Sequence, residues 1–408
     1  MNNHFAPNRG RSPKREHTGK VLSGTSSTAI SIVTTLFCVI GCFWMLFSVL
    51  SYSKTEHITS IHERDLTSEY KTYSDEIKSL SLEGIYSVDP IYVIPDTQII
   101  ANKPSEQGFG SVGSREEFAA IVQQAESYGL IEAGQLKFPD ENTPWHTSVN
   151  AEYYLDETIL SVSWKALIDQ NAINFTEVVI AHPSQFRKYL TENTFSSSKR
   201  KTVSALSKEL NAVVGMSADF YAYRHKGVVV YGGELYRSSY MPEFDNCYIN
   251  REGDLLFSPR GSITDKELPG YIEQNNINFS LSFGPILVED GEVSPKAYGD
   301  YVVGQPRDYY ARAAIGQIGK QHYLLCTIDG GATSLGAPRD GTKVHRLAEV
   351  MQNMGCDKAY TLDGGQTATM TVNSKVFNSV GYGSERPVSD IIFFATALPE
   401  SHSTEDAQ

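Results

Sequence analysis

Cysteine is scarce in this chain: five occur among its 408 residues. Two lie in an apolar N-terminal stretch, and the others are Cys247, Cys326 and Cys356. Three cysteines cannot form a complete disulfide framework, so we predict buried thiols, with a single bridge as the alternative. The chain also lacks CxxC and HExxH motifs, and its ten histidines are scattered. We therefore predict no cofactor, although a divalent cation could join acidic side chains to a phosphate.

Positive charge is also in short supply. The formal net charge is −13, and residues 1–27 contribute five basic and one acidic residue, so the rest of the chain sums to −17. Because nucleic acid is bound by a basic face, we predict no nucleic-acid partner. An anionic substrate would have to be held by locally placed arginines and backbone N–H groups, since the overall field repels it.

No charged residue occurs between Lys20 and Lys54. Residues 28–52 are apolar, and about 25 residues at 1.5 Å rise can cross a hydrocarbon core of roughly 30 Å. Basic residues precede this stretch and mixed charges follow it, which predicts a cytoplasmic N-terminus and an extracytoplasmic remainder at the cell membrane. A buried core helix and a cleavable signal peptide are the alternatives. The stretch is long for a signal peptide and has no evident small-residue cleavage site, so we favour a retained signal anchor.

The composition divides the chain into six segments. They are a cytoplasmic basic tail (1–27), the transmembrane signal anchor (28–52), a polar stalk that is helical or disordered (53–84), a small accessory region (85–149), a main domain (150–398) and a polar tail (399–408). In the accessory region we expect an extended run at 91–100. A helix should follow from Ser114, because Ser114 and Glu117 have the spacing of a capping box.

A GxGxxG pattern precedes that helix, from Gly108 to Gly113. In a dinucleotide site this pattern follows a strand directly, through a tight turn. Here the preceding extended run ends about eight residues too early, and Asn102 to Ser105 intervene. We therefore expect a loop at this position and no bound dinucleotide.

Short apolar runs alternate with a few helical patterns in the main domain. We expect strands at 178–181, 212–215, 227–231, 247–250, 255–258 and 279–283, and helices at 184–190, 203–210 and 342–354. Thr342 is the expected N-cap of the last helix and Gly355 its stop. The predicted fold class is α+β, with mixed β-sheets and flanking helices, preceded by the transmembrane helix and the stalk.

The most informative segment runs from Tyr360 to Met370 (YTLDGGQTATM). Residues 358–362 indicate a short buried strand that delivers Asp363 into Gly364-Gly365, where backbone N–H groups could approach a ligand closely. A second strand should follow, with Thr367 and Thr369 on one face, and then a two-residue hairpin turn at 373–374. An ordinary tight turn is the alternative interpretation of such a DGG triplet.

Several segments of the C-terminal half resemble the phosphodiester glycosidase family, in order along the chain. They are 177–221, 278–292 (NFSLSFGPILVEDGE), 312–316 (RAAIG), 323–330 (YLLCTIDG), the LDGG segment and 384–390 (SERPVSD). The resemblance covers about residues 150–398. The family usually has Asn-Gly where this chain has Ser217-Ala218, ahead of a matching Asp219.

The resemblance implies hydrolysis of a sugar phosphodiester at the anomeric carbon. This reaction needs a carboxylate and groups that bind the phosphate. The carboxylates on the matched motifs are Asp363, our first choice, and Asp219 and Glu385. Arginine binds two phosphate oxygens at once, which favours Arg312 and Arg386. Further expected binding residues are Gly364, Gly365, Gln366, Thr367 and Asp329, where Asp329 repeats the strand-to-DGG pattern and is otherwise a turn aspartate.

The leading hypothesis is a membrane-anchored extracytoplasmic hydrolase that acts on a carbohydrate phosphodiester of cell-wall polymer or exopolysaccharide. Two alternatives stay open. One is a non-catalytic surface module that binds glycans or assists polymer assembly, and the other is a phosphodiesterase that cuts the P–O bond. Fold resemblance alone does not decide among the three.

Overall fold

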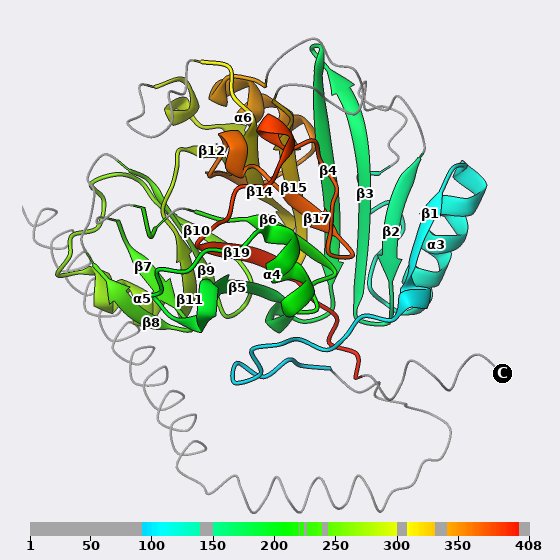
Figure 1. Ribbon diagram of the computed structural model, residues 1–408, viewed down its shortest axis with the longest axis horizontal. Coiled ribbons are helices and arrows are strands. Elements are labelled where there is room, and N and C mark those ends of the chain that lie inside the picture. Colours follow the sequence, from blue (N-terminus) through cyan, green and yellow to red (C-terminus); the bar gives the residue numbers. More distant parts are fainter. Residues whose placement is uncertain are drawn as a thin grey trace, which may run out of the picture. The chain divides into compact units, whose positions relative to one another are not determined.

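The computed structural model describes residues 92–138, 150–219, 221–223, 227–238, 244–299, 308–330 and 341–399. The segment from Pro90 onward forms one compact unit (Figure 1). The expected membrane span at 28–52, the stalk at 53–84 and the tail at 399–408 fall outside the described residues, apart from Pro399. Among the helices that are described, none is long and apolar enough to cross a membrane.

The centre of the unit is a nine-stranded sheet. Its strands, in spatial order, are β1 (Phe109–Val112), β2 (Ala151–Leu155), β3 (Ile159–Ile168), β4 (Asn171–Ile180), β15 (His322–Ile328), β14 (Arg312–Gly319), β16 (Lys358–Leu362), β12 (Ile286–Glu289) and β13 (Glu292–Val293). Strand β1 comes from the expected accessory region, so that region contributes to the same sheet as the main domain.

A second sheet of five strands packs on one face of the first. Its order is β18 (Lys375–Val376), β17 (Met370–Val372), β6 (Val214–Ser217), β19 (Asp390–Phe394) and β5 (Phe186–Leu190). Two smaller sheets complete the strands: β10 (Leu255–Ser258), β9 (Asn246–Asn250) and β11 (Ile277–Leu281), and the hairpin of β7 (Val229–Tyr231) and β8 (Glu234–Arg237). All these strand pairs are antiparallel. The expected mixed sheets would contain parallel pairs as well, and none occurs among the described strands.

Helices cover the outer faces of both sheets. The α-helices are α3 (Arg115–Ser127), α4 (Val203–Glu209), α5 (Leu268–Gln274) and α6 (Val344–Asn353). Residues of α3 and α6 share one apolar cluster with the nine-stranded sheet, and residues of α4 share another with the five-stranded sheet. A third cluster fills the space between the two sheets. The layers are therefore helix, sheet, sheet and helix, which confirms the α+β class.

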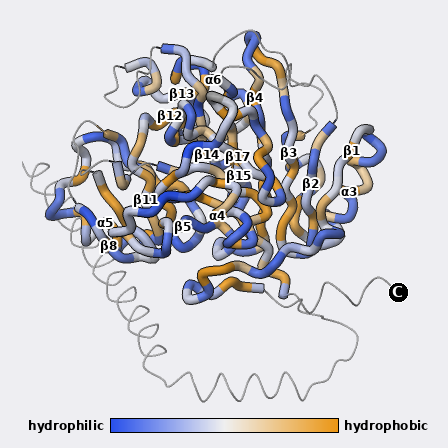
Figure 2. The backbone as a smooth tube through the Cα atoms, in the orientation of Figure 1, coloured by the Kyte–Doolittle hydropathy of each residue, from blue (hydrophilic) through white to orange (hydrophobic). Residues whose placement is uncertain are grey.

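The central strands are buried on both faces. All ten residues of β4 and all seven of β15 are buried. Figure 2 shows apolar residues gathered along the central strands, with hydrophilic residues at the connections. A strand that is covered on both sides has no alternation of polar and apolar residues. The limits of these long strands are therefore hard to predict from the sequence.

Several local predictions are confirmed. Helix α3 begins after Ser114, whose Oγ accepts the Glu117 N–H at 3.1 Å. The turn between β17 and β18 is the expected two-residue hairpin, with φ of 47° at Asn373 and 59° at Ser374. The three described cysteines, Cys247, Cys326 and Cys356, are buried free thiols.

Other local predictions are wrong. Residues 186–190 form strand β5, because pairing with β19 overrides the local helical pattern. The pattern from Gly108 to Gly113 contains β1 instead of a loop, and residues 92–100 form no strand. Helix α6 starts one residue later than expected, with Lys343 at its N-cap, because Thr342 pairs with Tyr310 in a short bridge.

Candidate active site

The Asp363 turn fits tightly between two other elements. The Asp363 N–H donates to the Ala218 carbonyl at 3.0 Å, and the Gly365 N–H donates to the Ala311 carbonyl at 2.8 Å. A Cβ on Gly364 would lie 2.6 Å from the Ala311 oxygen, so only glycine allows this approach. The turn therefore joins the end of β16 to the start of β14 and to the residue after β6. The chain continues as a 3₁₀ turn at Gly365–Thr367, so the second strand predicted here starts only at Met370.

Arg312 is a buried cation at the first position of β14. It is 4% exposed, its Nε donates to the Thr342 carbonyl at 3.0 Å, and its Nη2 donates to the Asp308 carbonyl at 2.9 Å. The guanidinium also lies over the Tyr310 ring, 5.4 Å from the centroid. Burial lowers the pKa of Arg312 to about 10, so the side chain stays protonated at neutral pH. These contacts fix a positive charge at the end of the strand.

The strand register places Arg312 beside Asp363. Ala313 pairs with Leu362 across β14 and β16, so the next position brings Arg312 opposite Asp363. Ala313 and Leu362 both belong to the apolar cluster between the two sheets. Because side chains alternate along β14, Arg312 lies on the opposite face of the sheet from Ala313. The backbone of the Asp363 turn runs close to Arg312, since a Cβ on Gly364 would lie 3.6 Å from the Arg312 Cα.

Asp219 has a different environment from Asp363. It is 2% exposed, its Oδ1 accepts the Tyr221 N–H at 2.7 Å, and its Oδ2 accepts the Ser282 N–H at 2.9 Å. The Lys188 ammonium lies 3.5 Å from the same Oδ2. Through these contacts the Asp219 carboxylate links its own segment to those that contain Ser282 and Lys188. Asp219 follows Ala218, whose carbonyl accepts the Asp363 N–H. The hydrogen bonds and the ion pair of Asp219 therefore help to hold the Asp363 turn in place.

Lys188 also pairs with Asp390, at 3.0 Å, and both side chains are at most 1% exposed. Burial alone would lower the pKa of Lys188, but the charges of Asp219 and Asp390 raise it above its ordinary value. Burial and the neighbouring charge of Asp219 together raise the pKa of Asp390 to about 7, against the opposite pull of Lys188. No local pattern in the sequence indicates this role of Lys188, because residues 184–190 have a helical pattern.

Glu385 and Arg386 lie on a surface loop. Glu385 accepts hydrogen bonds from the N–H of Ser204, at 3.0 Å, and from the Ser204 hydroxyl, at the first turn of α4. A carboxylate at a helix N-terminus is stabilised by the helix dipole. The guanidinium of exposed Arg386 lies over the Tyr223 ring, 5.3 Å from its centroid, and Arg200 lies at the same distance from that ring.

The glutamine after the glycines connects this loop to the turn. Gln366 Nε2 donates to the Ser384 carbonyl at 3.5 Å, a long hydrogen bond. Thr367 is buried, at 5% exposure. The loop that carries Glu385 and Arg386 therefore borders the Asp363 turn, although these two side chains are engaged elsewhere.

Asp329 is fully buried at the end of β15. Its Oδ1 accepts hydrogen bonds from Asn174 Nδ2 at 2.7 Å and from the Ser379 N–H at 3.2 Å. Burial raises the pKa of Asp329 to about 6. Strand β15 is the other neighbour of β14 in the sheet. Asp329 and Asp363 therefore follow strand ends that lie at the same end of β14. Among the described residues, no three His, Cys, Asp or Glu side chains are grouped so that they could hold a metal ion.

Comparison with known families agrees with this geometry. Residues 210–395 match the family model described as phosphodiester glycosidase. The matched segment, just under half of the chain, resembles the phosphodiester glycosidase family. This confirms the resemblance found in the sequence, and all ten candidate site residues lie inside the matched segment. The family described by that model is one of glycosidases, which are hydrolases.

Individual relatives of this phosphodiester glycosidase domain are distant. The SPbeta prophage-derived uncharacterized protein YomE of Bacillus subtilis (strain 168) is 24% identical over 211 residues, which is 50% of this chain and 31% of that protein. This chain thus spans about a third of that relative's length.

Two solved structures are also similar. The zebrafish N-acetylglucosamine-1-phosphodiester alpha-N-acetylglucosaminidase catalytic domain, auto-inhibited by its pro-peptide, is 16% identical with a TM-score of 0.48, covering 58% of this chain and 83% of that one. A hypothetical protein from Synechocystis is 14% identical with a TM-score of 0.41, covering 58% and 62%.

Proposed function

We propose that this protein is a membrane-anchored extracytoplasmic hydrolase that cleaves sugar-1-phosphodiesters of cell-wall polymer or exopolysaccharide. The family match and the position of Arg312 opposite Asp363 support the reaction. The anchor is supported by the uncharged stretch at 28–52 and the basic residues before it.

The single observation that carries this proposal is the position of Arg312 next to the Asp363 turn, which follows when the register of β14 and β16 is continued by one residue beyond Ala313 and Leu362. In the reaction the bond between the anomeric carbon and the phosphate oxygen breaks, with both electrons leaving on oxygen. Water supplies the new hydroxyl at the anomeric carbon, and the products are a free sugar and a phosphomonoester. The fixed charge of Arg312 stabilises the departing phosphate, and Asp363 stabilises the positive charge that develops on the sugar, or attacks it, or activates water.

The backbone at the two glycines has a narrower role than the sequence suggested. The Gly365 N–H already donates to Ala311, so in this structure it is used to fix the turn. We assign the close approach of a phosphate to Gly364 and to the side chains around it. Asp219 and Glu385 remain candidate carboxylates, but their hydrogen bonds to Tyr221, Ser282 and Ser204 indicate supporting roles.

Hydrolysis in ¹⁸O-labelled water tests the reaction. The full-length chain, in a detergent without a sugar head group, would be incubated with a panel of sugar-1-phosphodiesters while reducing sugar and phosphomonoester are both measured. We expect the label in the sugar. Label in the phosphate would identify a P–O cleaving phosphodiesterase, and no turnover of any substrate would favour the glycan-binding alternative.

The anchor has a separate test. Protease added to intact cells whose envelope it can penetrate should remove the C-terminal domain and spare the first 27 residues. Protection of the C-terminal domain would contradict the proposed orientation.

A further inference from the structure

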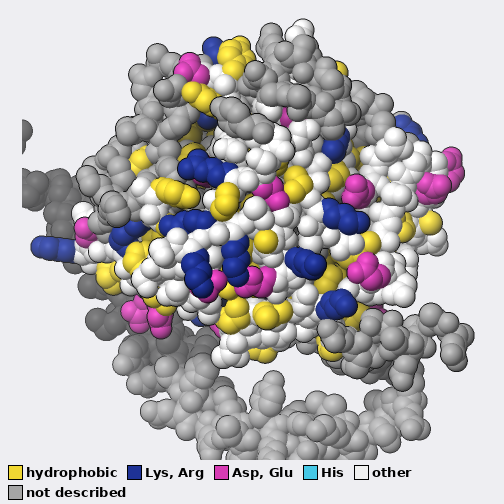
Figure 3. Space-filling view, in the orientation of Figure 1, with side chains coloured by type: hydrophobic (Ala, Val, Ile, Leu, Met, Phe, Trp, Pro, Cys, Tyr) yellow, Lys and Arg dark blue, Asp and Glu magenta, His cyan; other side chains and the backbone are white. Residues whose placement is uncertain are grey.

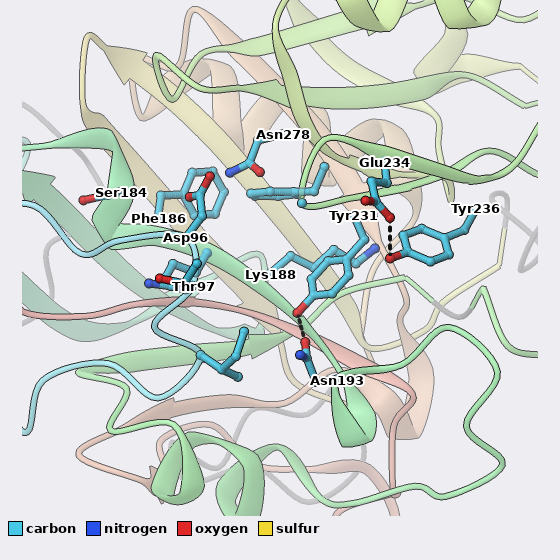
Figure 4. A pocket seen from close by; sticks show the side chains of 14 residues that line it. Asp96, Thr97, Ser184, Phe186, Lys188, Asn193, Tyr231, Glu234, Tyr236 and Asn278 are labelled. Carbon is cyan, nitrogen blue, oxygen red and sulfur yellow. Dashed lines mark hydrogen bonds between the residues drawn. The ribbon is translucent and has the colours of Figure 1, made fainter.

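A pocket lies outside the candidate active site. Four segments line a pocket of about 290 Å³: the loop at 96–99, the turn and strand at 184–188 with Asn193, the β7–β8 hairpin, and residues 278–279 of β11. In Figure 4, Asp96, Thr97 and Ser184 lie on one side of this pocket and Glu234 and Tyr236 on the other. Its volume is near the lower end of the roughly 300–1,000 Å³ typical of small-molecule sites.

Hydrogen bonds hold the polar side chains of the pocket in place. Tyr231 Oη donates to Asn193 Oδ1 at 2.6 Å, and Tyr236 Oη donates to Glu234 Oε2 at 3.1 Å (Figure 4). Asp96 forms an ion pair with Arg251. Burial raises the pKa of Tyr231 to about 12, so its phenol stays neutral at any physiological pH. A site whose side chains are already ordered loses less entropy when it binds a ligand.

Aromatic rings form the apolar part of the pocket. Tyr236 is 43% exposed, and its ring packs on Phe195 with 5.7 Å between centroids. Phe186 and Phe279, at the base, meet edge to face at 5.3 Å. Tyrosine offers an apolar face together with a polar end, which suits a ligand that is both flat and polar.

Two cations, Arg187 and Lys188, are among the residues that line the pocket. Arg187 Nη2 donates to the Gln98 carbonyl at 2.7 Å, whereas its Nη1 is buried and has no hydrogen-bond partner among the described residues. The Lys188 ammonium is paired with Asp219 and Asp390 behind the pocket. Figure 3 shows Lys and Arg side chains over the face that carries α4, but this pocket places its carboxylates, Asp96 and Glu234, on opposite sides. The two carboxylates and the two cations of the lining balance, which favours a ligand without net charge.

We propose that this pocket binds an uncharged sugar ring, such as a hexose or an N-acetylhexosamine. Carboxylate and amide oxygens of Glu234 and Asn193 accept hydrogen bonds from sugar hydroxyls, Asn278 supplies an amide donor, and the Tyr236 ring contacts the C–H face of the sugar. The proposal is independent of hydrolysis: the pocket recognises a sugar unit away from the phosphodiester, and Lys188 and Asp219 lie between it and the Asp363 turn.

Calorimetric titration of the full-length Asp363→Asn chain, which should bind without turnover, tests the proposal. The probes are glucose, galactose and N-acetylglucosamine, with glucose 6-phosphate as the anionic counterpart. We expect a Kd on the order of 1 mM for at least one uncharged probe and binding about tenfold weaker or more for the phosphorylated one. The proposal is overturned if none of the uncharged probes saturates the protein at about 20 mM, or if glucose 6-phosphate binds more tightly than they do.

Two substitutions in the same background locate the binding. Tyr236→Ala should weaken it by about tenfold or more, whereas Tyr298→Ala, at a 55% exposed tyrosine outside the pocket, should leave it unchanged. Equal effects of both substitutions would place the sugar elsewhere and overturn the proposal. Thermal unfolding of each variant shows whether a loss comes from misfolding, and Glu234→Gln, at an exposed side chain, gives a second variant that removes one acceptor charge without a cavity.

Failure of this pocket and failure of the proposed hydrolysis are distinguishable. With Asp363 intact, Tyr236→Ala should hydrolyse a small soluble sugar-1-phosphodiester at the parent rate. Loss of sugar binding with retained hydrolysis fits the pocket alone, and sugar binding without any hydrolysis in the parent contradicts only the proposed reaction.

Discussion

Arg312, the first residue of β14, lies next to the turn that carries Asp363 after the end of β16, because Ala313 pairs with Leu362 in the register of the two strands. The two residues are 51 positions apart in the chain, so the register of two antiparallel strands creates their proximity. Cleavage of a sugar phosphodiester requires at least a carboxylate and a cation that can bind phosphate. Residues of both kinds occur where these two strands end. The first two predictions test these residues.

Asp363→Asn should reduce kcat by about 100-fold or more, equivalent to about 2.7 kcal/mol of barrier, because the amide keeps the size of the side chain and removes its charge. The turn should persist, since it is held by backbone hydrogen bonds to Ala218 and Ala311. Asp357→Asn, at an exposed position before β16, is the matched control and should leave kcat unchanged. Activity of Asp363→Asn within a few-fold of the parent would assign Asp363 to turn structure.

Arg312→Lys should reduce hydrolysis nearly as much as Arg312→Ala. Lysine keeps the charge but has no planar fork to hold two phosphate oxygens and two carbonyls, and its ammonium is more strongly hydrated. Arg386→Lys should have a smaller effect, because Arg386 is exposed and stacks on Tyr223. The measurement is kcat/KM on a sugar phosphodiester and on a glycoside with a neutral leaving group. Equal losses on both substrates would show that Arg312 supports only the fold.

Asp329 should make stability depend on pH. Burial raises its folded pKa from 3.8 to about 6, so the folded state holds the proton more tightly than the unfolded state does. The resulting stabilisation is fully present below about pH 3.8 and is lost as the pH rises through about 6. Asp329→Asn should therefore gain stability relative to the parent between pH 4 and pH 7, as measured by urea unfolding at several pH values.

The exposed Asp290→Asn is the control for this pH dependence. Its stability difference from the parent should stay constant over the same range. A constant difference for Asp329→Asn as well would show that Asp329 titrates alike in the folded and unfolded states.

Lys188→Met should destabilise the fold by about 3–5 kcal/mol, because it leaves Asp219 and Asp390 without their buried cation. The exposed Lys208→Met on α4 removes the same charge and should change the unfolding free energy by less than about 0.5 kcal/mol. Adding Asp390→Asn to Lys188→Met should restore part of the loss. Additive effects of the two substitutions would contradict a shared network.

The sequence alone determined the features that depend on neighbouring residues. The capping spacing of Ser114 and Glu117 located the start of α3, the pattern after Thr202 located α4, and the paired turn residues Asn373-Ser374 located the β17–β18 hairpin. The apolar run before Asp363 and the two glycines after it predicted strand β16 and the turn that follows it, whereas the catalytic role of that turn stays a prediction. The family resemblance came from the same local motifs.

Only the tertiary structure decided the features that depend on distant partners. Residues 186–190 could form a helix locally, and pairing with β19 made them a strand. That strand carries Lys188 to Asp219 and Asp390, which gives Asp219 a supporting network that no local pattern revealed. The position of Arg312 opposite Asp363 also depends on strand register. The chain encodes local turns and helix ends over a few residues, whereas pairings between distant strands are selected by burial and hydrogen bonding of the whole fold.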